Sequence, residues 1–163
     1  MEDKQLKEIV DGIVKRYQKD SISKASKAVN LATALQLCEA VKAEAKRIGV
    51  NAVVCVSDRG GHPILVECMD DAYIASYDVA VNKAYTVVAL KMSTATLKPL
   101  AQPGAELYGI QFTNGGRIVV FGGGDPLLGD NGEIIGGLGV SGGSEAEDTT
   151  LSAFGKTYFE TKI

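Results

Sequence analysis

The side chain best suited to chemistry in this sequence is His62, the only histidine in the chain. It follows Gly60 and Gly61, in the turn of a predicted β-hairpin between two apolar runs. Imidazole is a common ligand for haem iron, and a residue in a turn is accessible to a ligand. The alternative interpretation is a polar turn residue that points into solvent. One histidine does not supply the ligands of a zinc site, so zinc-dependent hydrolysis is not expected.

Asp70, Asp71 and Lys83 are the next candidates. Lys83 lies in a mainly apolar helical segment, where an unpaired ammonium group would be costly. We therefore expect Lys83 to pair with Asp70 or Asp78, or to face the carboxylate of a ligand such as a haem propionate.

The sequence Ser141-Gly142-Gly143-Ser144 directly precedes a predicted helix. Its backbone N–H groups could bind an anion at the helix N-terminus. Ordinary capping of the helix by Ser144 explains the same residues equally well.

Tyr73, Tyr77 and Tyr85 lie on or near the predicted central helix. A phenolate can ligate ferric haem, although such rings more often pack with the hydroxyl at a wet edge. Met69 is a candidate soft ligand or pocket wall, with core packing as the alternative. No nucleophile with an activating base can be assembled, so catalysis is not predicted.

These candidates would be positioned by an α+β domain. Apolar residues recur with helical spacing over residues 3–18 and, after Asn30 as a predicted N-cap, over residues 31–48. Two predicted strands flank the Gly60-Gly61 turn, and residues 75–92 are predicted to form a largely buried helix.

A second hairpin is predicted in the glycine-rich region, with strands over residues 118–121 and 133–140. The last helix is predicted to begin with the capping box of Ser144 and Glu147 and to run to about residue 159. Two hairpins favour an antiparallel sheet, and we expect the helices on one of its faces.

Composition and charge narrow the classes of function. The net charge is -3, and no cluster of basic residues is present, so nucleic-acid binding is not expected. No signal peptide and no apolar run long enough to span a membrane is found, so a cytoplasmic protein is expected. The cysteines form no C-x-x-C pair, and Cys55 and Cys68 are expected to be buried in strands, with raised thiol pKa values.

Several short motifs occur together between roughly residues 29 and 160. They comprise Asp58, Gly60, Gly61 and Pro63, then Met69, Asp70, Asp71 and Ala72, then Ser76, Ala80, Lys83, Ala84 and Thr86, and finally Gly122, Gly123, Gly124, Pro126, Gly132, Ile135, Gly136, Gly139, Val140, Ser141, Gly142 and Asp148. In this combination the chain resembles the GlcG/HbpS family, which also forms the C-terminal domain of propanediol-utilisation corrinoid adenosyltransferases.

The resemblance implies a profilin-like α/β/α or α+β domain that assembles into homo-oligomers, often octamers. Its antiparallel sheet would have about four to five strands with helices packed on it. Several family members bind haem, so haem or another tetrapyrrole is the implied cofactor, with His62 as the candidate ligand of the iron. The implied binding residues are His62, Met69, Asp70, Tyr73, Lys83, Ser141 and Gly142.

The chain departs from the family pattern in two places. Members commonly carry arginine where this chain has Cys68, which removes a cation near the implied pocket. The N-terminal amphipathic helix, within residues 1–20, is additional, and a linker over residues 21–29 connects it to the domain of residues 30–163. Because no adenosyltransferase domain is present in the sequence, that activity is not implied.

The helix over residues 3–18 has two interpretations. It could pack on its own domain or on a sister subunit, or it could bind shell proteins, because it resembles the targeting helices of bacterial microcompartment cargo. The sequence thus leaves three hypotheses: a haem-binding homo-oligomer, an assembly or cargo module without a cofactor, and an enzyme for a small carboxylated metabolite that uses Asp70, Lys83 and the turn at Ser141.

Overall fold

A four-stranded antiparallel sheet forms the centre of the domain. The computed structural model describes residues 10–12 and 27–163, so most of the predicted helix over residues 3–18 and the linker up to residue 26 lie outside the described residues. The strands are β1 (Val53–Asp58), β2 (Pro63–Cys68), β3 (Gly124–Leu128) and β4 (Ile134–Ser141), in the spatial order β2-β1-β4-β3. Both pairs of strands that follow each other in sequence are hairpins, as predicted.

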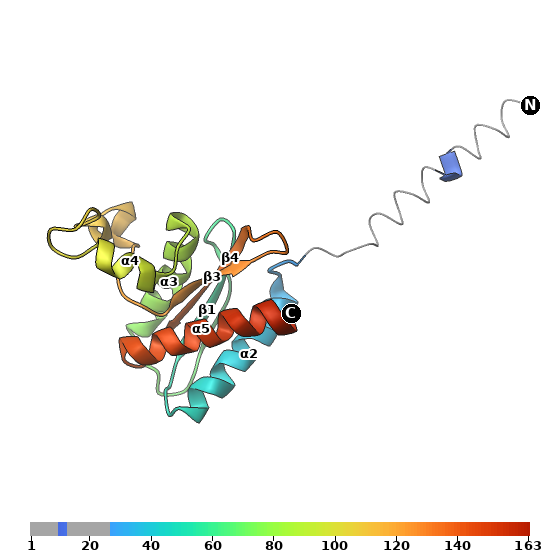
Figure 1. Ribbon diagram of the computed structural model, residues 1–163. Coiled ribbons are helices and arrows are strands. Elements are labelled where there is room, and N and C mark those ends of the chain that lie inside the picture. The colour runs from blue at the N-terminus through green and yellow to red at the C-terminus, as the bar shows by residue number, and fades with distance from the viewer. Residues whose placement is uncertain (1–9, 13–26) are drawn as a thin grey trace, which may run out of the picture.

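Helices cover both faces of this sheet (Figure 1). α2 (Leu31–Arg47) and α5 (Glu145–Lys162) pack on the face that carries Val54 and Val56, and α3 (Ser76–Leu90) packs on the face that carries Val53 and Cys55. The expectation of helices on one face was therefore wrong. The nearly continuous apolar run in β1 is typical of a strand that is buried on both sides.

Glycines in β4 let α3 approach the sheet closely. A Cβ atom added to Gly137 would lie 2.3 Å from the carbonyl oxygen of Ala84, and one added to Gly139 would lie 2.0 Å from that of Ala80. These distances leave no room for a side chain. The glycines of β4 therefore make room for the backbone of α3 to pack directly on the sheet.

The second hairpin differs from the prediction in its first strand. The strand β3 covers Gly124–Leu128 instead of residues 118–121. In residues 118–121, Val119 instead donates its N–H to Thr86 Oγ1 on α3. β3 is an edge strand, a position that tolerates Pro126 because one side of the strand needs no backbone partner.

The ends of the helices follow local sequence signals. Asn30 and Ser144 cap α2 and α5, each in a capping box with Thr33 or Glu147, as predicted for both cap positions. Between α3 and β3 the chain forms the short helix α4 (Thr94–Leu100) and two 3-10 turns, Ile110–Phe112 and Asn114–Gly116. None of the helices among residues 10–12 and 27–163 is long and apolar enough to cross a membrane.

Candidate functional site

Asp58 organises the turn between β1 and β2. Its Oδ1 atom accepts hydrogen bonds from the backbone N–H groups of Gly60, at 2.8 Å, and His62, at 2.9 Å. These two bonds are the main reason why the pKa of the Asp58 carboxyl group lies below its usual value. The turn is therefore closed by a carboxylate that the sequence places four residues before the histidine.

His62 projects from this turn into solvent, and its side chain is 81% exposed. Its Nδ1 atom lies 3.4 Å from Asp58 Oδ1. A carboxylate beside Nδ1 favours the tautomer with its proton on that nitrogen, which leaves the lone pair of Nε2 free. The imidazole is therefore accessible to a ligand from solvent.

Two further side chains lie beside the turn. The Tyr85 ring, on α3, contacts Gly61 so closely that an added Cβ would be 2.8 Å from the ring. The guanidinium carbon of Arg117 lies 3.6 Å from the centroid of the same ring. We call the surface formed by Asp58, His62, Tyr85 and Arg117 the turn site.

Met69 and Asp70 lie at the opposite end of β2 from His62. The six residues of the strand span about 20 Å at ~3.3 Å per residue, so one small ligand atom cannot contact both ends. Both residues line a hollow of about 460 Å³ with Lys42, Lys46, Asn51, Cys68 and Asp71. The Met69 sulfur accepts the N–H of Ala52 at 3.3 Å and is engaged within the fold.

Tyr73 and Gly142 line an adjacent hollow of about 450 Å³ at the N-terminus of α5, which we call the cap pocket. Its other lining residues are Gly49, Val50, Asn51, Asp71, Gly143, Ser144 and Glu147. Among the described residues, its lining includes two carboxylates and no lysine or arginine, so its charge does not suit an anion.

The backbone donors at this helix N-terminus are occupied by the protein itself. Gly143 N–H donates to Asp148 Oδ1 at 2.9 Å, and Ser144 N–H donates to Glu147 Oε2 at 2.7 Å. Of the two interpretations of this segment, capping holds, and the anion-binding interpretation was wrong, because carboxylates of α5 already fill the role of the anion.

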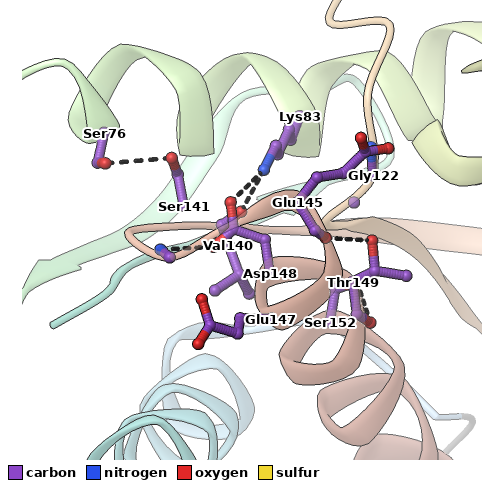
Figure 2. A network of polar contacts seen from close by, with 12 residues as sticks. Ser76, Lys83, Gly122, Val140, Ser141, Glu145, Glu147, Asp148, Thr149 and Ser152 are labelled. Carbon is purple, nitrogen blue, oxygen red and sulfur yellow. Dashed lines mark hydrogen bonds and ion pairs between the residues drawn. The ribbon is translucent and has the colours of Figure 1, made fainter. Parts of the chain in front are cut away.

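Lys83 is completely buried and pairs with Asp148, not with Asp70 or Asp78 as expected. Figure 2 shows its ammonium group directed at Asp148 Oδ2 and at the carbonyl oxygen of Val140, each at 2.8 Å. Burial lowers the pKa of Lys83, and the Asp148 carboxylate opposes this shift. Lys83 lines neither hollow, so its predicted contact with a ligand is not supported.

Ser141 is also buried, and its hydroxyl lies 3.1 Å from that of Ser76 (Figure 2). Asp70, Lys83 and Ser141 therefore do not share a pocket, which removes the geometric basis for the carboxylated-metabolite enzyme. Cys55 is buried as expected, but Cys68 is exposed, because it ends an edge strand. Burial raises the thiol pKa of Cys38 and of Cys55 to about 12.

The seven predicted binding residues thus fall into three places: His62 at the turn site, Met69, Asp70, Tyr73 and Gly142 around the two hollows, and Lys83 and Ser141 in the interior. Sequence reasoning missed the part played by Arg117. Its signal was a cation directly after Gly115 and Gly116, in an otherwise weakly charged segment. Within residues 10–12 and 27–163, no three His, Cys, Asp or Glu side chains are grouped to hold a metal ion.

Comparisons with known proteins give a consistent assignment. The chain is 46% identical over 124 residues to an uncharacterised 15.0 kDa protein from the dhaT-dhaS intergenic region of Citrobacter freundii, covering 76% of this chain and 87% of that protein. It is 41% identical over 117 residues to the corrinoid adenosyltransferase PduO of Salmonella typhimurium, covering 72% of this chain but only 34% of PduO.

A solved structure described as a PduOC:heme complex superimposes with a TM-score of 0.76 at 38% identity, covering 80% of this chain and 94% of that one. The model of the HbpS-like family, described as haem-degrading protein HbpS-like, matches residues 29–155. This match covers most of the chain and the whole sheet with α2 and α3. The protein belongs to the HbpS-like family.

Proposed function

We propose that the protein binds haem, or a closely related tetrapyrrole, at the turn site, with His62 as the ligand of the iron. The observation that carries the proposal is the pairing of Asp58 with the Nδ1 side of an exposed His62. Histidines that bind metals commonly donate their other N–H to a carboxylate, which fixes the ring and raises its basicity. Bound haem would supply redox and oxygen chemistry, while His62 and Asp58 would hold and orient it.

The family assignment supports this proposal independently of the site. A relative with 38% identity is described as a complex with heme, and the match includes nearly all of that chain. The other candidate ligands are less suitable, Met69 because of its contact within the fold and Tyr73 because of the charge around it. Met69 is engaged with Ala52, and Tyr73 lines a pocket whose carboxylates, Asp71 and Glu147, would repel haem propionates.

A second part of the proposal is that the subunits form a homo-oligomer, with an octamer as the arrangement that the family resemblance implies. Exposed apolar side chains gather at the start of α3, where Tyr73 is 73%, Ile74 is 96% and Tyr77 is 50% exposed. Apolar groups gathered on a surface in this way commonly mark a protein interface. Light scattering after size exclusion should give a multiple of the 17.1 kDa subunit, and a monomer at micromolar concentration would refute this part.

The third part concerns residues 3–18, which we propose bind shell proteins of a bacterial microcompartment. The support is the apolar stripe of this segment in the sequence, with Leu6, Ile9, Val10, Ile13, Val14 and Tyr17. Deletion of residues 1–20 should leave the fold and the oligomer intact and abolish co-purification with shells. A truncated protein that dissociates or melts earlier would show that the segment packs on the domain instead.

A titration of the full-length protein with hemin tests the haem proposal. Wild type should give a saturable Soret band with one haem per subunit, and His62→Ala should shift or abolish that band. If no saturable binding occurs in wild type, the alternative of an assembly or cargo module without a cofactor takes its place.

A further inference from the structure

Arg117 is the cation at the turn site. Its guanidinium carbon lies 3.6 Å from the centroid of the Tyr85 ring. Within residues 10–12 and 27–163, no carboxylate lies within 4 Å of this guanidinium, and it donates no hydrogen bond to another residue. It therefore presents its N–H donors, arranged in a rigid fork, without an acceptor among the residues that the structure describes.

The backbone around Arg117 is fixed to α3 on both sides. Thr86 Oγ1 lies 3.3 Å from the carbonyl oxygen of Arg117 and accepts the N–H of Val119 at 3.0 Å. Asn114 donates its side-chain amide to the hydroxyl of Tyr85 at 3.2 Å. The ring on which the guanidinium rests is therefore held in place as well.

The three residues before Arg117 have an unusual backbone conformation. Asn114, Gly115 and Gly116 have φ angles of 51°, 67° and 78°, three left-handed residues in succession. Asparagine tolerates this conformation better than most side chains, and glycine adopts it freely. The chain thus reverses tightly just before Arg117 and brings it over Tyr85.

Arg117 and the turn that carries His62 contact the same aromatic ring, the turn through Gly61. The Tyr85 ring contacts Gly61, the residue before His62. The guanidinium of Arg117 lies against the same ring. The turn site therefore combines an imidazole, an apolar ring surface and a cation that has no acidic partner among the described residues. A planar ligand with an apolar body and a carboxylate at its edge would satisfy all three groups.

We propose that Arg117, held against Tyr85, binds a carboxylate of the ligand at the turn site, which for haem is a propionate. The proposal rests on the proposed function, because it takes the ligand to be a tetrapyrrole. Arginine binds carboxylates through two parallel hydrogen bonds, and a guanidinium that is already stacked loses little freedom on binding. Arg117 would thus select for tetrapyrroles with free acid groups.

Iron-free protoporphyrin IX and its dimethyl ester test this directly, since neither can be ligated through iron by His62. Dissociation constants from porphyrin fluorescence would be measured for wild type, Arg117→Ala, Arg117→Lys and Arg47→Ala. Arg47 is a matched control, because it lies on α2 and pairs with Glu44. Wild type should bind the diacid about 10-fold or more tightly than the ester, as expected for hydrogen bonds between charged groups.

Arg117→Ala should lose this preference, Arg117→Lys should keep part of it, and Arg47→Ala should keep all of it. Equal melting temperatures would show that the variants are folded. An unchanged preference in both Arg117 variants overturns the inference. If hemin binding in that case still depends on His62, only the role of Arg117 fails. If wild type binds hemin but neither iron-free porphyrin, the inference fails and the proposed function stands. If wild type binds neither the porphyrins nor hemin, the inference and the proposed function both fail.

Discussion

Lys83 on α3 and Asp148 on α5 form a buried ion pair at the end of β4, with 2.8 Å between Nζ and Oδ2. The side chain of Lys83 is completely buried and that of Asp148 is 4% exposed. The remaining oxygen of Asp148 accepts the N–H of Gly143, and the Phe121 ring lies 4.9 Å from the ammonium group. This pair joins the two helical layers and the end of β4.

Removal of one partner should destabilise the fold strongly. Lys83→Met leaves the Asp148 carboxylate buried without its cation, a change that typically costs ~3–5 kcal/mol. Guanidinium-induced unfolding should show this loss for Lys83→Met, and the double variant with Asp148→Asn should cost less than the sum of the single changes. Lys98→Ala, which breaks the partly exposed pair with Glu145, should cost at most ~1 kcal/mol. Equal losses at Lys83 and Lys98 would contradict this account.

The contact between α3 and β4 should not tolerate a methyl group at Gly139. A Cβ there would lie 2.0 Å from the backbone oxygen of Ala80, so helix or strand must move. Gly139→Ala should therefore destabilise by an amount at the upper end of the ~1–3 kcal/mol found for overpacked cores. The matched control is Gly129→Ala, whose nearest obstacle is the flexible carboxylate of Glu133. A melting temperature of Gly139→Ala equal to that of the control would refute the close contact.

The three cysteines should differ sharply in their reactivity toward a thiol reagent. Cys38 and Cys55 are buried, with thiol pKa values raised to about 12, whereas Cys68 is exposed. Because the thiolate is the reactive form, a thiol reagent at pH 8 should modify one cysteine per native chain and three after denaturation. Cys68→Ser should abolish the native reaction. Rapid modification of a second thiol in the native protein would show that the strands open more readily than the packing implies.

Asp58 should strengthen haem binding through His62. Asp58→Asn keeps an oxygen that can accept the two backbone N–H groups of the turn but removes the charge beside Nδ1. Loss of such a carboxylate partner typically weakens metal binding about 10–100-fold, so the hemin dissociation constant should rise by at least ~10-fold. Asp70→Asn, at the other end of β2, should leave it unchanged. Weaker hemin binding in Asp70→Asn with unchanged binding in Asp58→Asn would place the ligand at the hollows instead.

Local signals in the sequence predicted the ends of the helices, because a cap depends on residues three apart. The N-cap at Asn30 and the capping box of Ser144 with Glu147 are both found where the sequence placed them. The partner of Lys83 could not be predicted in this way, since Asp148 is 65 residues further along the chain. Nearby acids in the sequence suggested the wrong partners.

The strand β3 shows how tertiary context overrides strand propensity. Residues 118–121 are β-branched and aromatic, yet residues 124–128, with Gly124 and Pro126, form the strand. Gly124 fits against α4 and α3, because an added Cβ would lie 2.9 Å from Thr94 on α4 and 3.0 Å from Val87 on α3. An edge position, which the sequence did not reveal, accepts the proline.

The candidate site was predictable in part. His62 and its accessibility followed from the turn. His62 and Met69 were predicted in one binding set, but they lie at opposite ends of β2. The stacking of Arg117 on Tyr85 joins residues from a loop and a helix, so it appears only in the folded chain.

Ligation of haem iron by His62 at the turn site is best tested by a Soret-monitored hemin titration of wild type, His62→Ala and Tyr73→Phe, with added imidazole as a rescue. If His62 is the ligand, wild type and Tyr73→Phe should bind hemin saturably, and His62→Ala should show a shifted or lost band. Free imidazole should then restore the wild-type band by replacing the missing ligand. An unchanged band in His62→Ala together with a changed band in Tyr73→Phe would contradict ligation by His62 and place the haem at the cap pocket.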